Sequence, residues 1–429
     1  MRTSRILGAS SVALAAVLAL SACSAGSDTA DGKGKTITVW AMTGDLSSKT
    51  LDAINKKFTE ETGAKVSVQT QQWTNIATKI TTALATSTPP DVLDLGNTQV
   101  ATFAASGGLA DLTSHKSDLE QGQTWLGGLV DPGTVDGKLY GVPSFGAARA
   151  VVYNKTIWAK AGITDVPTTY QDLEKDLNAV KAANTDPSFS AFYMPGQYWY
   201  AGMQWVWDAG GDIATQKGGK WTAGFSSANA QKGLQAWKEF QNTYSSAASQ
   251  TLNTTDPDQD ALFANGQASA ILANNWEISA IEKDNPQLSD SDIGSFPLPS
   301  AHSNNQPVLL AGSNWGIAQK SSNQDLARAW VKIAASPSIQ KDYVFGVDKW
   351  IPNSVEESRT ASTSSALPAN GKAFFVAAQN SKATPASGNW ASLESPGMTQ
   401  FFQSVASGTK SASDAASAWD ATINSTLNQ

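Results

Sequence analysis

The chain has 429 residues, a formal net charge of −7 and a single cysteine. Its lysines are interspersed among more numerous acidic residues, which argues against nucleic acid as a partner, because nucleic acid selects basic patches. One cysteine excludes an intramolecular disulfide, so packing must stabilise the fold, and the length suffices for two domains or lobes.

Residues 1–22 have the pattern of a secretory signal peptide. Arg2 and Arg5 precede an apolar run, Ile6–Leu20, that is too short to span a bilayer comfortably and ends in small residues. The segment Leu20-Ser-Ala-Cys23 resembles the bacterial lipobox, whose cysteine takes a diacylglyceryl group and becomes the new N-terminus. An ordinary buried cysteine is the alternative. We expect lipidation of Cys23, which anchors the protein on the outer face of the cell membrane.

Residues 24–35 (SAGSDTADGKGK) are small, polar and free of large apolar side chains. Such a segment has little to pack, so residues 23–35 are predicted to be a lipidated N-terminus and flexible tether.

Strand and helix patterns alternate after the tether. Apolar alternation and helical spacing predict the order strand, helix, strand, helix, strand, helix, over residues 36–41, 47–61, 65–69, 75–85, 91–95 and 100–105. This order is typical of an α/β fold with parallel strands, in which ligands bind outside the carboxyl ends of the strands. The loops at those ends place Asp45, Trp73, Asn97 and Gln99 among the candidate site residues.

The rest of the chain continues the mixture of strands and helices. Extended runs cover 139–143 and 150–155, and a helix followed by a strand is expected within 262–275. The Ser/Thr-rich segment 358–365 is predicted to be a surface loop. Amphipathic helices are predicted at 173–183, 226–244, 325–335 and 415–427.

Catalytic and metal motifs are missing from the sequence. His115 and His302 lie in polar turns, and no metalloprotease, nucleophile-elbow or phosphate-loop pattern occurs. Asp256–Asp260 resembles a calcium loop, but Ala261 and Gln267 stand where such a loop needs Gly and Glu, so we interpret it as an acidic helix start. We expect no metal and no cofactor.

The 15 tryptophans are unusually many, and an indole offers sugar rings an apolar face and one donor. Trp237, Trp330 and Trp419 recur at helical spacing and are predicted to be core, as are Trp40 and Trp158. The aromatic residues in predicted loops could either stack on a ligand or pack within a lobe. They are Trp73, Trp199, Trp276, Trp315, Trp350 and Trp390, with Tyr200.

Across nearly all of the chain after residue 35, the sequence resembles the solute-binding proteins of ATP-driven sugar importers, the group that includes maltose-binding protein. The resemblance rests on the order and spacing of short segments: Ile37–Trp40 (ITVW), Phe58–Gly63 (FTEETG), Pro90–Leu93 (PDVL), Ala105–Leu112 (ASGGLADL), Gly137–Pro143 (GKLYGVP), Val152–Lys155 (VYNK), Asn275–Glu277 (NWE) and Gly312–Asn314 (GSN).

This resemblance implies a type II periplasmic-binding-protein fold, with two α/β lobes, three crossing strands as a hinge and a ligand cleft between the lobes. Lobe 1 would comprise 36–146 plus 312–346, and lobe 2 147–311 plus 347–429. The crossings are expected near 147–150, 308–311 and 346–352. Closure about the hinge would bury the ligand.

The resemblance also implies further site residues. Trp276 stands where relatives carry an aromatic that stacks on a sugar ring, with Glu277 after it. Ser313, Asn314 and Trp315 follow a tight glycine turn that lets backbone amides approach a ligand. Arg149 stands where relatives often carry a sugar-binding or hinge-bracing arginine, although Phe145-Gly-Ala-Ala before it departs from their polar pattern. Trp199 and Trp350 complete the candidate set.

The implied function is capture of a di- or oligosaccharide by a lipid-anchored monomer that delivers it to importer permease subunits. The segment 40–45, with 72–73 and 96–99, resembles actinobacterial relatives that take up N,N′-diacetylchitobiose, which is our leading ligand. Cellobiose, xylobiose and maltose-type sugars are the other candidates. A secreted glycoside hydrolase, which needs two facing carboxylates, and a surface recognition module without a small ligand are the alternatives.

Overall fold

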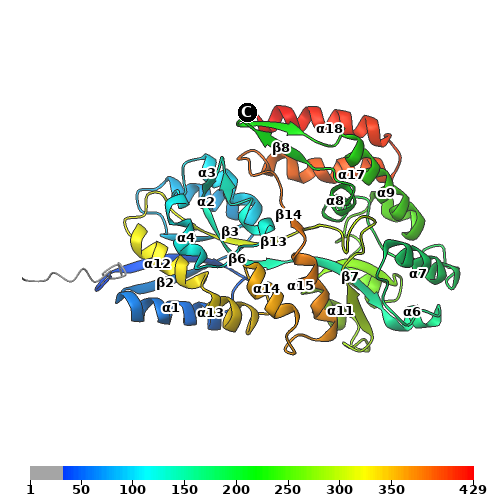
Figure 1. Ribbon diagram of the computed structural model, residues 1–429, viewed down its shortest axis with the longest axis horizontal. Helices are drawn as coiled ribbons and strands as arrows, with labels where there is room; N and C mark the ends of the chain where they lie inside the picture. Colours follow the sequence, from blue (N-terminus) through cyan, green and yellow to red (C-terminus); the bar gives the residue numbers. More distant parts are fainter. Residues whose placement is uncertain (1–31) are drawn as a thin grey trace, which may run out of the picture.

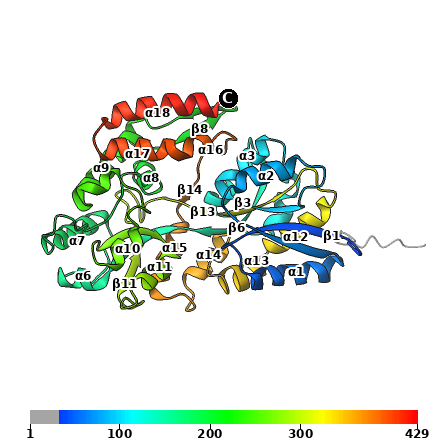
Figure 2. The same cartoon turned by 180° about the vertical axis from the view of Figure 1, so that it is seen from behind.

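The computed structural model describes residues 32–429, which form two lobes lying side by side (Figures 1 and 2). Each lobe mixes helices and strands, so the expected two-lobe α/β class is confirmed. The signal peptide, the lipidation of Cys23 and most of the tether lie outside the described residues. Within residues 32–429, no helix is long and apolar enough to cross a membrane.

Lobe 1 is built on a five-stranded sheet in the order β2-β1-β3-β13-β6. Strand β1 is parallel to β2 and β3, whereas β13 is antiparallel to β3 and β6. The bounds are β1 Thr36–Met42, β2 Lys65–Gln71, β3 Val92–Gly96, β6 Gly141–Ala147 and β13 Ala311–Ile317. Because β1, β2 and β3 are parallel, their carboxyl ends meet at one edge of the sheet, and the chain there continues into Asp45, Trp73 and Asn97.

Helix α1 shows how local sequence determines the elements of lobe 1. Ser47 caps its first turn by accepting from the Thr50 amide, and Gly63 ends it with a φ of 72° that favours glycine. Its apolar face packs with α12 on one side of the sheet, while α2 and α3 cover the other side. The helices are α1 Ser48–Thr62, α2 Ile76–Ala85, α3 Val100–Ala105, α12 Gln324–Ala334 and α13 Pro337–Ile339.

The last residues of the predicted tether, 32–35, are hydrogen-bonded to lobe 1 at Gly32 and Lys35, although only Gly32 is buried. The Gly32 amide donates to the Thr62 carbonyl (2.9 Å), and the Lys65 amide donates to the Lys35 carbonyl (2.9 Å). A Cβ at position 32 would lie 2.9 Å from the Leu326 side chain. The backbone thus joins lobe 1 before β1, where absence of a side chain permits the close approach.

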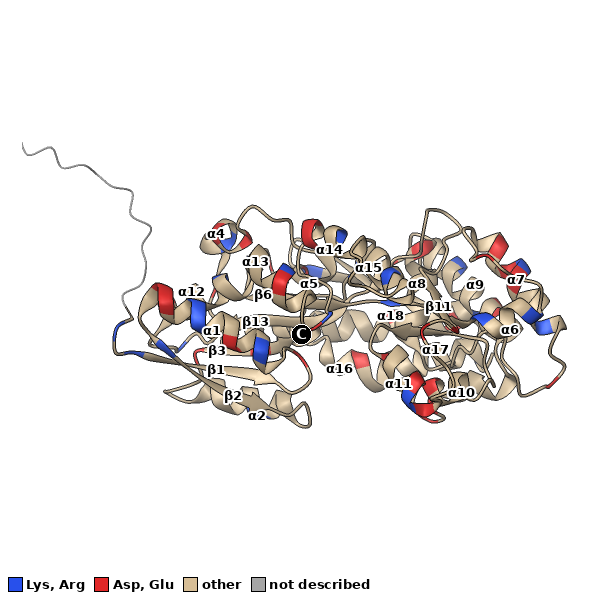
Figure 3. Cartoon of the chain, turned by 90° about the horizontal axis from the view of Figure 1, so that it is seen from below, with Lys and Arg blue, Asp and Glu red and all other residues tan. Residues whose placement is uncertain are grey.

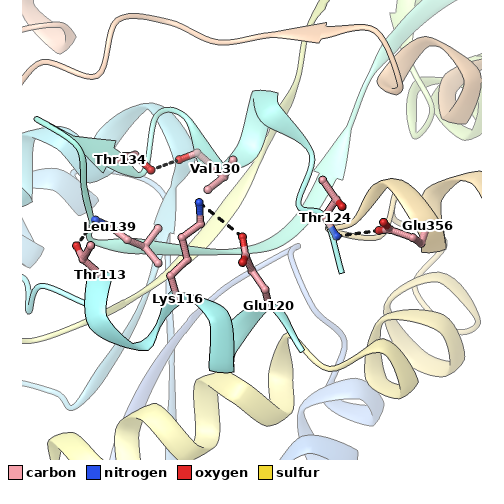
Figure 4. Close-up of polar contacts among 8 residues, drawn as sticks. All are labelled: Thr113, Lys116, Glu120, Thr124, Val130, Thr134, Leu139 and Glu356. Atoms are coloured by element: carbon pink, nitrogen blue, oxygen red, sulfur yellow. Dashed lines mark hydrogen bonds and ion pairs between the residues drawn. The ribbon is translucent and has the colours of Figure 1, made fainter. Parts of the chain in front are cut away.

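The segment between α3 and β6 folds over lobe 1 through α4 Lys116–Glu120, α5 Gly127–Val130, β4 Thr134–Val135 and β5 Lys138–Leu139. The Leu139 amide donates to Thr113 Oγ1 (3.0 Å), which closes this segment on itself (Figure 4). The Thr124 amide donates to the Glu356 carboxylate (2.9 Å) on α14 Val355–Ser362. The segment is therefore tied to chain that follows the third crossing.

Lobe 2 is centred on the antiparallel sheet β10-β7-β11, surrounded by helices (Figure 1). The strands are β7 Arg149–Asn154, β10 Ala270–Asn274 and β11 Ile293–Phe296, with a separate hairpin β8 Ala214–Lys217 and β9 Lys220–Ala223. The helices are α6 Lys155–Lys160, α7 Tyr170–Ala182, α8 Trp199–Asp208, α9 Ala228–Tyr244, α10 Gln259–Ala264, α11 Glu277–Asp284, α15 Lys372–Ala378, α16 Ala391–Leu393, α17 Thr399–Ala406 and α18 Ala412–Leu427.

The surface loop predicted at 358–365 is wrong for residues 358–362, which belong to α14. Ser354 caps this helix by accepting from the Glu357 amide, and Ser358 and Ala361 are buried on its inner face. Small side chains here serve close packing rather than exposure.

Three segments pass between the lobes. Ala148 joins β6 to β7, and Leu310 joins β12 Val308–Leu309, which pairs with β14 Ser381–Lys382, to β13. Ile351 exchanges two backbone hydrogen bonds with Gly146 (2.8 and 3.0 Å). The side chains of Ala148, Leu310 and Ile351 are fully buried in one shared core. The lobes are thus connected by adjacent, well-packed strands.

Candidate functional site

Two carboxyl groups lie together at the carboxyl edge of the lobe 1 sheet. Asp45 follows β1, and its Oδ2 accepts from Ser313 Oγ (2.6 Å). Asp94 lies on the neighbouring strand β3, and its Oδ2 accepts from the Met42 amide (3.2 Å). Burial raises the pKa of Asp45 to about 6, and burial together with the adjacent Asp45 charge raises the pKa of Asp94 well above its usual range. Both shifts mean that the pair holds a proton more strongly than free carboxyl groups do.

Trp73 and Gln99 border the same edge. Trp73 is 40 % exposed, and a Cβ on Gly96 would lie 3.6 Å from its ring and 3.5 Å from Gln99 Oε1. The buried Oε1 of Gln99 has no hydrogen-bond partner within the described part of the chain. An open indole face beside an unsatisfied acceptor suits a ligand that carries both C–H faces and hydroxyl donors.

Trp276 is the corresponding exposed indole of lobe 2. It follows β10 directly and is 45 % exposed, the highest value among large apolar side chains in residues 32–429. Its ring meets Trp350 edge-on at 5.7 Å, while Trp350 stacks on Phe145 at 4.8 Å. The Trp350 indole N–H donates to the Asp45 backbone carbonyl (2.8 Å). Residues 45, 276 and 350, far apart in sequence, therefore adjoin.

Glu277 turns back on the end of β10, where its Oε2 accepts from the Asn274 amide (2.6 Å). Burial raises its pKa, while that hydrogen bond and the Arg149 charge oppose the rise. Because Asn274 and Glu277 are bonded on either side of Trp276, the indole is presented from a short, braced turn.

Arg149 pairs with Asn274 across β7 and β10. Its Nε donates to the Tyr198 hydroxyl (2.8 Å), and its guanidinium lies 4.6 Å over the Tyr200 ring. Its Nη1 is buried without a partner in the described structure, so it is a donor that a ligand could satisfy. Tyr198 was not selected by sequence reasoning, because only the fold brings it to Arg149.

Tyr200 connects Arg149 to Glu394 in the C-terminal part of the chain. Its hydroxyl donates to Glu394 Oε1 (3.0 Å), and burial raises the pKa of Glu394. Trp199 is 3 % exposed and packs on Tyr200 (4.0 Å) and Trp390 (6.2 Å) in the lobe 2 core. Trp199 therefore has little surface left for a ligand in this structure, and the half-buried Tyr200 has more.

Three other candidates support the backbone. Asn97 Nδ2 donates to the Leu310 carbonyl (2.8 Å) at the second crossing, and its Oδ1 accepts from the next amide. Asn314 is fully buried, and its Nδ2 donates to the Leu129 carbonyl (3.1 Å). Trp315 is also fully buried and meets Trp330 edge-on at 4.8 Å in the lobe 1 core. In this structure these side chains therefore serve lobe packing, while Asn314 Oδ1 and Trp315 Nε1 are buried without a hydrogen-bond partner within the described residues.

Acidic residues gather around α10 and α11 (Figure 3). Asp258 caps α10 by accepting from the Asp260 amide (3.0 Å), which confirms the helix-start interpretation over the calcium loop. Burial and the Glu277 charge raise the pKa of Asp260 to about 8. Residues 32–429 contain no group of three or more His, Cys, Asp or Glu side chains arranged to hold a metal ion.

The site thus combines two exposed indoles from different lobes with carboxyl, amide and guanidinium groups. Asp45 and Asp94 adjoin on one wall, so they cannot flank a glycosidic bond from opposite sides as a hydrolase requires. Such a surface can hold a polar ring compound by stacking and hydrogen bonds.

Comparison with known proteins identifies the family. The family profile described as bacterial extracellular solute-binding protein matches residues 44–341. The diacetylchitobiose-binding protein DasA of Streptomyces coelicolor is 33 % identical over 426 residues, 96 % of each chain. The sugar-binding protein MalE of Xanthomonas citri has the same fold, with a TM-score of 0.79 at 22 % identity over 92 % of this chain and 97 % of that one. GacH of Streptomyces glaucescens aligns with a TM-score of 0.71 at 21 % identity, covering 92 % and 99 % of the chains. The chain belongs to the bacterial extracellular solute-binding proteins.

Proposed function

We propose that this protein captures a disaccharide or short oligosaccharide for an ATP-driven importer and delivers it to the permease subunits in the membrane. The observation that carries the proposal is the pair of exposed indoles, Trp73 on lobe 1 and Trp276 on lobe 2, beside polar side chains that lack partners. Stacking suits the apolar C–H face of a pyranose, whereas its rim of hydroxyls needs hydrogen bonds. Two indoles favour a ligand of more than one ring.

N,N′-Diacetylchitobiose is the leading ligand, because the relative that binds it is 33 % identical over 96 % of the chain. The test is calorimetric titration of the purified protein with diacetylchitobiose, cellobiose, xylobiose and maltose. Saturable binding of one sugar is expected, with a matching rise in unfolding temperature, because a ligand selective for the folded state stabilises it. A complete absence of binding across the panel would refute the proposal for disaccharides.

The hydrolase alternative is separated by following the bound sugar chromatographically for hours. We expect the sugar to remain intact. Release of its monosaccharides, abolished by changing one carboxylate, would establish an enzyme instead.

We further propose that the lobes, 36–146 plus 312–346 and 147–311 plus 347–429, close about the three crossing segments when sugar binds. The adjacent packing of Ala148, Leu310 and Ile351 supports a hinge there, since small changes in crossing strands rotate whole lobes. Scattering from the monomer should give a smaller radius of gyration with the bound sugar than without it.

Anchoring at Cys23 completes the proposal. In cells that process lipoproteins, mass spectrometry should find a diacylglyceryl group on Cys23, and Cys23→Ser should release the protein from the membrane fraction. An unmodified Cys23 in membrane-bound protein would overturn this part alone.

A further inference from the structure

The lobes also touch at a place that uses none of the proposed sugar-binding side chains. Thr102 Oγ1 on α3 of lobe 1 donates to the Gly388 carbonyl of lobe 2 (3.0 Å). Gln216 Nε2 on β8 of lobe 2 donates to Asp136 Oδ1 of lobe 1 (2.9 Å). In Figures 1 and 2, α3 faces the β8 hairpin and the C-terminal end of the other lobe. Thr102, Ala105, Asp136, Gln216 and Gly388 are called the rim contact below.

The rim contact depends on glycine at position 388, because this residue has no side chain. A Cβ on Gly388 would lie 2.5 Å from Ala105 Cβ, whereas packed carbon atoms prefer about 3.5–4.0 Å. Gly388 has no left-handed φ that would itself demand glycine. Glycine at this position therefore serves the approach of the two lobes and not a backbone turn.

Local turns present the polar partners. Asp136 has a φ of 50° and is followed by Gly137 with a φ of 77°, so a tight β4–β5 turn carries the carboxylate outward. The opposing residue Gln216 lies on the β8–β9 hairpin, which Gly218 and Gly219 close. A cavity of about 510 Å³ between the lobes is lined by Tyr140 on one side and Trp221 on the other, among other residues. Two hairpins thus meet where no covalent crossing connects the lobes.

Rotation of one lobe relative to the other must change the distances between these partners, because Thr102 and Asp136 lie on lobe 1 whereas Gly388 and Gln216 lie on lobe 2. A single hydrogen bond typically changes an equilibrium by roughly two- to twelvefold. Two such bonds and a close packing contact are enough to shift an equilibrium between open and closed lobes substantially.

We propose that the rim contact sets the balance between open and closed lobes, and through it the affinity for sugar. The affinity part rests on the proposed function, because apparent affinity scales with the fraction of protein in the binding-competent form. The conformational part stands without any ligand.

The experiment measures the distance between spin labels on the two lobes, in the absence of sugar, by double electron–electron resonance. Labels at Thr78→Cys on α2 and Lys283→Cys on α11 are introduced in the Cys23→Ser chain, which otherwise contains no thiol. Both positions are exposed. The parent protein is expected to populate a short, closed distance.

Gly388→Ala should move the population to a longer distance, and adding Ala105→Gly should restore the short distance by making room for the new methyl group. Gly371→Ala is the matched control, because its Cβ would meet nothing nearer than 3.4 Å and it lies away from the other lobe's rim. Unchanged distances in Gly388→Ala, or failure of Ala105→Gly to restore them, would overturn the proposal. The restoring pair also excludes simple misfolding as the cause.

A second arm removes one hydrogen bond while preserving shape. Thr102→Val should raise the open fraction roughly two- to twelvefold, whereas Thr81→Val, which removes a hydroxyl bonded only within α2, should leave it unchanged. Once a sugar is identified, its apparent Kd should rise in proportion to the loss of closed population. If no sugar binds even the parent protein, the proposed function fails while the distances still decide the fate of the rim contact.

Discussion

Replacing Trp276 by alanine tests the sugar site most directly, because the structure supplies the expected magnitude. A tryptophan side chain offers roughly 250 Å², so the 45 % exposed fraction leaves about 110 Å² available to a ligand. A sugar ring that covers one face removes about half of this area from water. At ~25 cal/mol per Å², the loss is about 1.4 kcal/mol, which is about a tenfold rise in Kd.

Calorimetric titration of Trp276→Ala with the sugar bound by the parent protein measures this change. Trp73→Ala should give a similar loss from the opposite lobe, since Trp73 is 40 % exposed. Val166→Ala is the control, because Val166 is 41 % exposed but belongs to no part of the site. If Trp276→Ala binds within twofold of the parent and unfolds at the same temperature, Trp276 does not contact sugar and the argument from exposure is refuted.

Three further predictions concern the polar and buried residues. Because folding raises the pKa values of Asp45 and Asp94, the folded protein binds more protons than the unfolded chain above about pH 4, and its free energy of unfolding should fall as pH rises through about 6. Thermal unfolding between pH 5 and 8 should show a smaller fall for Asp94→Asn than for the parent protein. Equal slopes would contradict the raised pKa values of this pair. Arg149→Lys keeps the charge but loses the planar fork and the Nε bond, so titration should show at least tenfold weaker sugar binding, while unchanged affinity would remove Arg149 from the site. Trp315→Phe should lower the free energy of unfolding by about 1–3 kcal/mol in a denaturant series and leave Kd within twofold; a large change in Kd would restore Trp315 as a ligand contact.

Much of the fold follows from local sequence. Helix α1 was predictable because Ser47, its apolar spacing and Gly63 agree about where it begins and ends. The helix α8, Trp199–Asp208, was not, because its sequence WYAGMQWVWD is apolar on every face and lacks the amphipathic period that identifies surface helices. Nearly the whole of α8 is buried in lobe 2, so its environment and not its pattern makes it a helix.

Some residues of the candidate site could likewise be predicted from the sequence, and others could not. The carboxyl ends of parallel strands meet at one edge of a sheet, and this rule alone predicts that Asp45, Trp73 and Gln99 lie near one another. The sequence did not reveal which face of β13 points inward, and this choice decides that Trp315 packs in the core. Asp94 could not be predicted as a site residue, because the sequence does not show that this carboxyl group on β3 lies beside Asp45 at the end of β1.

Long-range pairing also explains why the lobe 2 half of the site was harder to predict. The Arg149 guanidinium touches Tyr198 and Tyr200, and Tyr200 reaches Glu394 almost two hundred positions later. No spacing rule connects these residues, because each lobe is assembled from segments on both sides of the crossings.

The same assembly constrains how affinity can change. In the proposed function, the indole faces and unpaired polar groups select the sugar, whereas Thr102 and Gly388 bond to each other across the lobes. Substitutions in the two groups should therefore have separable effects: the first should alter discrimination between sugars, and the second should scale the affinity for all sugars by one factor. Measuring Trp276→Ala and Gly388→Ala against the same two sugars separates recognition from closure, because only the first should change the ratio of their dissociation constants.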